Sequence, residues 1–279
     1  MGEKQQAAIS PPDGATRLHI VIGDPIAQVK SPTGISLSFA ARGANAVMMP
    51  AHVTAAEFDG FVRGVAPMRN LDGLTITVPH KFAAFGHCAS VTPRARLLGA
   101  VNVMRRDATG AWHGDMLDGE AMVGAMRAAG CDPSGKAALL VGAGGAGTAI
   151  ALALLEAGVA SLALHDADAG RLATLLDRLR PVAGRAALRA LAEADPAGCD
   201  IVANATPAGM REGDKLPVRA DRLRPGMFVA DVVTAPEVTP LLAAARALGC
   251  GTSTGVDMFR AQIGLITDFL LGGVQRDAA

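Results

Sequence analysis

The chain has 279 residues, half of them hydrophobic, and its 26 basic residues balance its 26 acidic residues. At about 150 residues per domain, this length predicts two domains, each with a substantial core. A net charge of zero argues against a nucleic-acid surface, and no apolar run reaches the ~18 residues of a membrane span. Residues 1–16 lack the apolar stretch of a signal peptide and predict a loose tail. The four cysteines are far apart in the sequence, so a reduced, cytoplasmic protein is expected.

Upstream of residue 118, short apolar runs of strand type alternate with segments of helical spacing. The patterns predict strands at 18–22, 46–50, 74–78, 101–105 and 112–114, and helices at 33–42 and 55–66. Ser31 and Pro32 suit the start of the first of these helices. Strands that alternate with helices favour an α/β fold with parallel sheets and crossover helices.

A second alternating region follows a predicted helix at 119–129. Its strands are expected at 139–141, 162–166, 201–204 and 227–232, and its helices at 148–157, 169–179, 241–248 and 257–271. The sequence contains no internal repeat that would point to a solenoid or a propeller. This half of the chain therefore predicts a second α/β unit.

Gly142, Gly144 and Gly147 form the pattern G-x-G-x-x-G between a predicted strand and a predicted helix. This is the context of a dinucleotide-binding loop, where glycines allow a tight turn and a close approach to a pyrophosphate. The free N–H groups at the start of the following helix can donate hydrogen bonds to the phosphates. A glycine-rich turn in another α/β fold is the plainer alternative, but strand, helix and spacing agree on a Rossmann dinucleotide-binding domain.

Asp166 lies 19 residues after Gly147, at the end of the next predicted strand, where an acidic residue binds the adenosine ribose in such domains. A carboxylate there accepts both ribose hydroxyls and repels a 2′-phosphate. The next residue is Ala167 rather than an arginine, so NAD is favoured over NADP. Arg171 is the nearby cation that keeps NADP possible, and a solvated turn is the alternative role for Asp166.

Three polar residues upstream of the glycine loop are candidates for the chemistry of hydride transfer, which needs a group to take or give a hydroxyl proton. Lys81 follows a predicted strand, Asp118 precedes the nucleotide domain, and Asn102 lies between them. A lysine ammonium near an aspartate carboxylate can contact a substrate hydroxyl and shuttle its proton. Taken one at a time, such residues are more often surface charges or turn residues.

Seven motifs in order, the glycine loop among them, resemble the shikimate dehydrogenase family over nearly the whole chain after the tail. Gly73–Lys81 resembles the family's G-x-N-V-T-x-P-x-K, and Gly255, Met258 and Gln262 match its closing G-x-x-M-x-x-x-Q helix. The other four segments are Ile22–Pro32, Gly99–Asn102, Gly114–Gly119 and Asn204–Met210. The resemblance implies a substrate domain of residues 17–117 with 256–279, a Rossmann domain of residues 118–255, and a cleft between them.

The resemblance also implies roles for individual residues. Lys81 and Asp118 would form the catalytic pair at the substrate hydroxyl or ketone. The substrate would be held by Ser31, Thr75, Thr77, Asn102, Thr234 and Gln262. The cofactor would be lined by Gly142, Ala143, Gly144, Gly145, Ala146, Gly147, Asp166, Arg171, Asn204, Thr206, Val232 and Gly255. The histidines do not cluster as a metal site, so no metal is expected. His80, beside Lys81, is expected to be a solvated loop residue rather than one that points into the cleft.

Several positions depart from the family pattern. Val29 replaces the first serine of the S-x-S loop, Thr75 replaces an asparagine, and Thr234 replaces a tyrosine. Met116 and Leu117 stand where the family has asparagine and threonine. A pocket built to hydrogen-bond a hydroxyl loses orders of magnitude in kcat/KM when one hydrogen-bond partner is missing. These changes therefore predict that the substrate is a related, less polar hydroxy acid, or that activity on shikimate and quinate is weak.

Other functions are compatible with the same motifs. One is an authentic shikimate or quinate/shikimate dehydrogenase of aromatic amino-acid or quinate metabolism, with Ser31 and Thr75 sufficing. A second, of another class, is a non-catalytic NAD-binding sensor, although Lys81 and Asp118 are both present. A tetrahydrofolate dehydrogenase is more distant, because the seven motifs argue against it. The protein is expected to be a monomer or a homodimer with a small cyclic hydroxy acid as its partner.

Overall fold

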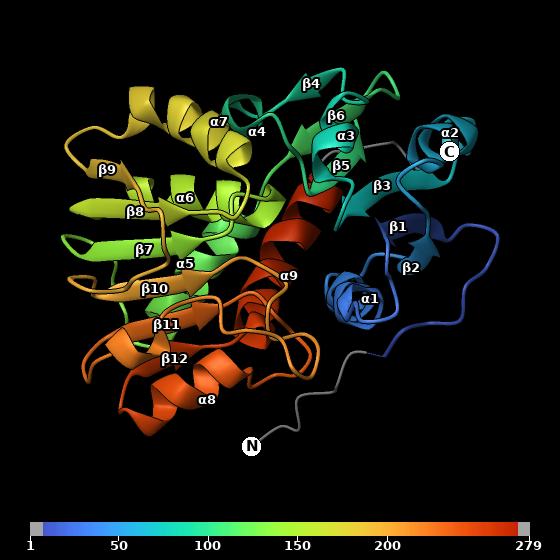
Figure 1. The fold of residues 1–279 in the computed structure, drawn as a ribbon. Helices are drawn as coiled ribbons and strands as arrows, with labels where there is room; N and C mark the ends of the chain where they lie inside the picture. Colours follow the sequence, from blue (N-terminus) through green and yellow to red (C-terminus); the bar gives the residue numbers. More distant parts are fainter. Residues whose placement is uncertain (1–7, 273–279) are drawn as a thin grey trace. The chain divides into compact units, whose positions relative to one another are not determined.

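The computed structural model describes residues 8–272, which divide into two compact units. The first unit extends to Leu117 and resumes at Ile263, and the second is Asp118–Gln262. Helix α9 (Gly255–Leu271) thus contributes its first half to the second unit and its last turns to the first (Figure 1). No helix among the described residues is long and apolar enough to cross a membrane.

The first unit contains a six-stranded sheet with the order β2-β1-β3-β5-β6-β4. The strands β1, β2 and β3 are mutually parallel neighbours, but β5 is antiparallel to both β3 and β6. The expectation of parallel sheets is therefore wrong for this part, because the short turn at Asp107 joins β5 to β6 as a hairpin, which allows only antiparallel pairing. The strands are β1 (Arg17–Gly23), β2 (Ala46–His52), β3 (Leu71–Ile76), β4 (Ser90–Val91), β5 (Val103–Arg106) and β6 (Trp112–Asp115).

One apolar cluster joins this sheet to helices from both ends of the chain. Ile35 and Phe39 of α1 pack with Val21 of β1 and with Ile266 and Leu270 of α9. All five side chains are at most 1% exposed, and each stabilises the fold by about 1.5–3 kcal/mol. The last turns of α9 are thus part of the first unit's core. The helices of this unit that precede it are α1 (Ser31–Ala41), α2 (Phe58–Val65), α3 (Lys81–Phe85) and α4 (Pro93–Leu98).

The segment just before β1 is more ordered than a loose tail. Thr16 is 3% exposed, and its hydroxyl donates to Oδ1 of Asn45 at 2.9 Å. The backbone N–H of Asp13 donates to the Thr16 hydroxyl at 2.8 Å, which closes a turn. The prediction of a tail through residue 16 therefore fails at its last residues, because Asn45 provides a distant partner; residues 1–7 lie outside the described residues.

The second unit contains a six-stranded sheet with the order β12-β11-β10-β7-β8-β9, and every neighbouring pair is parallel. From β7 the chain moves outward through β8 to β9, and then returns to β10 on the other side of β7. This is the strand order of a doubly wound Rossmann fold, in which ligands bind at the carboxyl ends of the two central strands. The strands are β7 (Ala137–Val141), β8 (Ser161–His165), β9 (Ala187–Ala190), β10 (Ile201–Asn204), β11 (Phe228–Asp231) and β12 (Gly251–Ser253).

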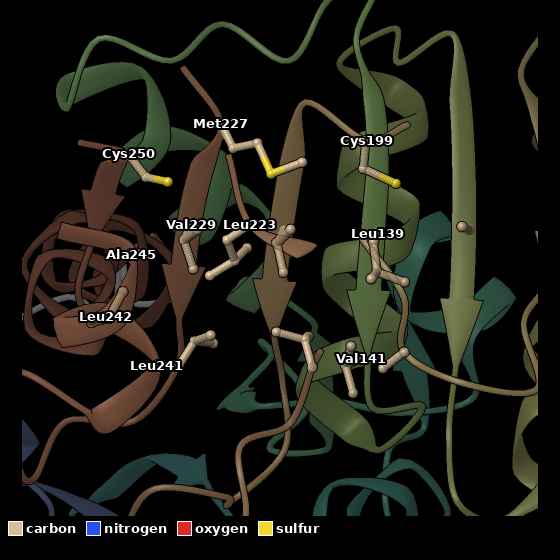
Figure 2. Packing of buried hydrophobic residues seen from close by; sticks show 14 residues of the cluster. Leu139, Val141, Cys199, Leu223, Met227, Val229, Leu241, Leu242, Ala245 and Cys250 are labelled. Carbon is tan, nitrogen blue, oxygen red and sulfur yellow. The ribbon is translucent and has the colours of Figure 1, made fainter. Parts of the chain in front are cut away.

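The core of the second unit explains why these apolar runs form strands. Leu139 and Val141 of β7 share one buried cluster with Val229 of β11 and with Leu241 and Leu242 of α8 (Figure 2). Continuous apolar strands of this kind are typical of a parallel sheet that is covered on both faces. The unit's helices before α9 are α5 (Asp118–Ala128), α6 (Gly145–Glu156), α7 (Ala169–Leu179) and α8 (Pro240–Ala247), with 3₁₀ turns at Arg180–Val182 and Ala220–Arg222.

Candidate functional site

The glycine loop lies between β7 and α6, at the point where the strand order reverses. Gly142 has a φ of +104°, in the left-handed region that favours glycine. A Cβ atom at Gly147 would lie 1.9 Å from the carbonyl oxygen of Gly142, so a side chain there would clash with backbone. Gly142 and Gly147 are therefore required by the turn and by the close packing of helix on loop.

Gly144 differs from these two glycines because it faces open space. No atom lies within 4 Å of the position that its Cβ would take, although it is the N-cap of α6. No side chain caps this 12-residue helix, so its first N–H groups and its dipole are available to an anion. The residues present thus fit the pyrophosphate of a dinucleotide, which needs room at Gly144 and donors from the start of α6.

Asp166 follows β8, and each of its two carboxylate oxygens accepts a main-chain hydrogen bond. Its Oδ2 accepts the N–H of Ala143 at 2.6 Å, and its Oδ1 accepts the N–H of Asp168 at 2.7 Å. Each carboxylate oxygen can accept a second hydrogen bond, so the group retains the capacity to bind ribose hydroxyls. Arg171 donates from Nε to Oδ2 of Asp168 at 3.1 Å, and its Nη2 is 3.9 Å from Oδ1 of Asp166. This arrangement places two carboxylates and one guanidinium at the end of β8.

Asn204, at the end of β10, is completely buried, and its side chain forms hydrogen bonds within the loop that follows it. Its Oδ1 accepts both the N–H and the hydroxyl of Thr206, at 3.0 and 2.7 Å. Its Nδ2 donates to Oδ1 of Asp231 at 3.0 Å. The predicted contact with the cofactor stays a prediction for both residues, and the geometry gives Asn204 the function of shaping the loop that presents Thr206.

Asp231, at the end of β11, was missed by the sequence analysis. It also accepts the hydroxyl of Thr239 at 2.8 Å and the N–H of Val233 at 3.0 Å, and burial raises the pKa of its carboxyl group. Thr239 in turn caps α8. An acidic residue at a strand end, followed by Thr-Pro at a helix start, was the available signal. Asn204 and Asp231 thus join the loops at the carboxyl ends of β10 and β11.

Gly255, the first residue of α9, is packed against the loop that follows β11. A Cβ there would lie 2.5 Å from the carbonyl oxygen of Val232 and 2.3 Å from that of Val233. The start of α9 and the loop of Val232 therefore approach each other at backbone distance. Val232 and Gly255 lie at the same edge of the sheet as the glycine loop, since all these loops follow the carboxyl ends of parallel strands.

Asp118 is the first residue of α5 and is 3% exposed. Gln262 of α9 donates from Nε2 to Oδ1 of Asp118 at 2.6 Å. A carboxylate at a helix N-terminus is stabilised by the helix dipole, and the amide of Gln262 fixes its orientation. The structure therefore joins two predicted site residues that are 144 positions apart.

Lys81 is the first residue of α3 and is 9% exposed. The N–H of Val101 donates to its carbonyl oxygen at 3.0 Å. Asn102, which follows Val101, accepts two further hydrogen bonds. Its carbonyl oxygen accepts the N–H of Ile76 at 2.7 Å, and its Oδ1 accepts the N–H of Leu117 at 2.9 Å. Main-chain hydrogen bonds thus bring the lysine segment and the G-A-V-N segment together in the first unit.

Thr77 lies beside the loop that follows β1. Its N–H donates to the carbonyl oxygen of Ile22 at 2.9 Å, and the N–H of Asp24 donates to the carbonyl oxygen of Val78 at 2.9 Å. A Cβ at Gly23 would lie 2.4 Å from Cγ2 of Thr77, so this pairing is close. The opening loop of the chain is therefore joined to the segment that leads to the lysine.

The substituted positions of the first unit have distinct environments. Thr75 is 5% exposed, and its hydroxyl has no hydrogen-bond partner among the described residues. Val29 is half-buried and packs against the core cluster of this unit, and Ser31 begins α1. In the second unit, Thr234 is half-buried after β11. Thr75, Val29 and Thr234 offer less polar reach than the asparagine, serine and tyrosine of the family pattern, whereas Ser31 matches it.

His80 contradicts the expectation of a solvated loop histidine, because it is only 2% exposed. Its ring is stacked on Phe58 of α2, with centroids 4.5 Å apart and planes 9° from parallel. Its Nε2 lies 2.8 Å from the carbonyl oxygen of Val53. Since a carbonyl only accepts, this contact assigns the ring proton to Nε2. No group of three or more histidine, cysteine or acidic side chains among the described residues is arranged to hold a metal ion.

The chain is similar to known enzymes over most of its length. Residues 21–104 match the sequence family described as the shikimate dehydrogenase substrate binding domain. A shikimate dehydrogenase (NADP(+)) of Rubrobacter xylanophilus is 40% identical over 247 residues, which are 87% of this chain and 86% of that protein. The quinate dehydrogenase of Corynebacterium glutamicum, solved in complex with NAD, is 30% identical, with a TM-score of 0.81 and coverage of 92% of this chain and 94% of that one. The ligand-free 5-ketofructose reductase of Gluconobacter sp. strain CHM43 is 29% identical, with a TM-score of 0.80 and coverage of 92% and 93%.

A Rossmann unit with a nucleotide loop, combined with an α/β unit that presents a buried lysine, defines an NAD(P)-dependent oxidoreductase that acts on a CH–OH group. The chain belongs to the shikimate dehydrogenase family. The resemblance and the α/β fold class predicted from the motifs are thereby confirmed. The roles of the individual site residues stay predictions.

Proposed function

We propose that this enzyme catalyses the reversible oxidation of a ring hydroxyl of a small cyclic hydroxy acid of the shikimate or quinate type. The observation that carries the proposal is the main-chain network of the first unit. It fixes Lys81 beside Val101 and Asn102, and Asn102 beside Ile76. A cation and an amide that are held by backbone, rather than by a mobile surface loop, have the fixed geometry that catalysis on a hydroxyl requires.

In the direction of oxidation, the substrate C–H bond breaks and its electron pair leaves as hydride to the nicotinamide, which is the chemistry that the dinucleotide supplies when bound. The hydroxyl proton passes to Nζ of Lys81, which releases it to solvent. Asp118 supplies a carboxylate to the same proton transfer, with its orientation fixed by Gln262. In the reverse direction, the Lys81 ammonium donates the proton to the ketone oxygen.

The cofactor preference that the adenosine end supports is NAD. Asp166 is fixed by the N–H groups of Ala143 and Asp168, so its negative charge cannot move away from a 2′-phosphate. The guanidinium of Arg171 is engaged by Asp168, and an exposed arginine of this kind offsets little of that charge. Among relatives, the Rubrobacter enzyme is named for NADP(+) and the Corynebacterium enzyme was solved with NAD, so both dinucleotides occur.

The pocket residues support a substrate that is less polar than shikimate. Thr75 has a buried hydroxyl without a protein partner, and Val29 is turned to the core instead of providing a second hydroxyl beside Ser31. Similar chains act on different ring or chain compounds, as the names quinate dehydrogenase and 5-ketofructose reductase indicate. These positions therefore favour an altered substrate specificity with the same catalytic pair, Lys81 and Asp118.

A substrate panel tests the proposal. The purified protein would be assayed for reduction of NAD and NADP with shikimate, quinate and cyclic hydroxy acids that lack one ring hydroxyl. We expect turnover with NAD, the highest kcat/KM on a less hydroxylated acid, and a loss of about 10³-fold in kcat for Lys81→Ala with NAD binding unchanged. If kcat/KM on shikimate is in the ordinary range for an enzyme and no other acid gives a higher value, the protein is an authentic shikimate or quinate dehydrogenase instead. NAD binding without turnover of any acid would favour the sensor.

A further inference from the structure

The helix that carries Lys81 is too short to hold its own position. Helix α3 extends only from Lys81 to Phe85, and isolated helices below about 12 residues are marginal in water. Nor does a side chain cap its start, since His80 occupies the N-cap position without such a bond. The location of the lysine must therefore come from contacts between this segment and the rest of the first unit.

Most side chains around Lys81 do not provide such contacts. Val78 is 60% exposed and Phe82 is 42% exposed, and Pro79 is exposed as well. Within α3 itself, Ala84 is buried as well, but its side chain is a single methyl group. In the turn that enters α3, the buried side chain next to Lys81 is that of His80, so the contacts of His80 contribute to the position of the lysine.

His80 is anchored in two independent ways to a different part of the same unit. Its ring stacks on Phe58, and its Nε2–H donates to the carbonyl oxygen of Val53, in the loop between β2 and α2. Its own backbone belongs to the turn, because its N–H donates to Thr77 at 3.0 Å and its carbonyl oxygen accepts the N–H of Ala84 at 2.8 Å. The side chain thus ties the first turn of α3 to α2 and to the end of β2.

We propose that His80 is a positioning residue for Lys81, acting through the stack on Phe58 and the hydrogen bond to Val53. The inference rests on the proposed function, because it assumes that Lys81 transfers the proton. The main-chain bond from Val101 to Lys81 fixes the lysine from one side, and His80 fixes the preceding residue from the other. Two anchors on adjacent residues restrict both the position and the direction of the lysine side chain. Loss of one allows the short helix to shift by about an ångström, which is enough to impair proton transfer.

His87 provides a matched control. It contacts the same Phe58 ring edge-on, with centroids 5.8 Å apart, and its Nε2 is 2.7 Å from Oδ1 of Asp59. It follows the end of α3 rather than its start, six positions beyond Lys81. Removing His87 therefore weakens the same packing between α2 and α3 without releasing the residue next to the lysine.

The test compares His80→Ala, His80→Phe, His80→Gln, His87→Ala and Lys81→Ala under single-turnover and steady-state conditions. The assay uses NAD and whichever of shikimate and quinate gives the wild-type protein its higher kcat/KM. We expect His80→Ala to lower the single-turnover rate and kcat by about 10²-fold, with the substrate KM and the NAD dissociation constant within about twofold. His80→Phe keeps the ring and His80→Gln keeps a donor, so each should recover part of the loss. His87→Ala should stay within about twofold of wild type.

Each contrary result identifies what is wrong. If His80→Ala keeps its rate while Lys81→Ala has lost it, the positioning inference is overturned and the proposed function stands. An equal loss in His87→Ala would show a general packing effect and would also overturn the inference. If Lys81→Ala itself keeps the wild-type rate, the proposed function fails, and the role of His80 fails with it. Should His80→Ala not fold, the Phe and Gln variants decide, because rates equal to wild type in both would exclude the two anchors.

Discussion

The side-chain amide of Gln262 donates a hydrogen bond of 2.6 Å to Oδ1 of Asp118 and so ties α9 to the first residue of α5. Asp118 is almost completely buried, with 3% of its surface exposed. A hydrogen bond to a charged group contributes about 1.5–3 kcal/mol. The orientation of this carboxylate therefore depends on a residue from the last helix of the chain.

Replacing Gln262 with leucine should lower kcat/KM by about 10- to 100-fold, because that energy is lost at Asp118, the proposed catalytic carboxylate. Steady-state kinetics on the best acid of the panel measures the effect. Arg260→Ala on the same helix is the control, since the Arg260 side chain is 66% exposed and pairs with Asp257 one turn earlier. Equal kinetics for Gln262→Leu and wild type would remove Gln262 and the orientation of Asp118 from the mechanism.

Two glycines of the nucleotide loop should respond differently to alanine. Gly144→Ala meets no atom within 4 Å, so we expect the free energy of unfolding to change by less than about 1 kcal/mol. The new methyl group would occupy the space assigned to the pyrophosphate, and the NAD dissociation constant should rise at least about tenfold. Calorimetric titration with NAD and thermal unfolding measure the two quantities.

Gly147→Ala is the counterpart, because its methyl group would lie 1.9 Å from the carbonyl oxygen of Gly142. We expect a loss of stability of about 1–3 kcal/mol, since backbone has to move. If Gly144→Ala binds NAD as tightly as wild type, the dinucleotide does not pass over this glycine, and the assigned loop is wrong.

The sequence predicted the second unit well because its signals are local. Leu139 to Val141 form a buried strand, and Gly142 to Gly147 require a turn wherever they occur. Strand β9 was not predicted, since Ala187–Ala190 is an edge strand whose pattern is mostly exposed and carries no alternation. Helix α4 was also missed, although Thr92 and Pro93 are a good cap and first residue for a helix.

The parts of the site that could not be predicted depend on partners far away in the sequence. Nothing near His80 indicates that Val53 and Phe58 will bury it, and no pattern reveals that Asp231 will bond to Asn204. The antiparallel pairing of β5 with β3 is likewise a property of the assembled sheet. Motif resemblance located Lys81, Asp118 and Gln262, whereas the supporting contacts of His80 and Asp231 became visible only in the tertiary structure.

Asp166 offers a test of cofactor choice. Asp166→Asn keeps an oxygen for the Ala143 N–H but removes the negative charge, so repulsion of a 2′-phosphate should fall. We expect the ratio of kcat/KM for NAD to that for NADP to decrease by about tenfold or more, which corresponds to about 1.4 kcal/mol. Asp177→Asn on α7 is the control, because its side chain is 69% exposed and pairs with Arg180, away from Asp166 and Arg171. A wild-type protein that already prefers NADP would contradict the NAD preference before any substitution is made.

His19 should make the first unit sensitive to mild acid. Its ring is 1% exposed in β1, and burial lowers its pKa from 6.5 to about 4. Above pH 6.5 the ring is neutral whether the protein is folded or not, so it has no effect on stability there. Between pH 6.5 and 4 the unfolded chain takes up a proton that the folded one excludes, and the free energy of unfolding should fall by about 3 kcal/mol. Trp112, the single tryptophan, is buried in the same unit, so its fluorescence during urea unfolding at several pH values reports this loss. His19→Phe should remove that share of the pH dependence while keeping the ring contact with Phe39, and an unchanged slope in this variant would show that another group is responsible.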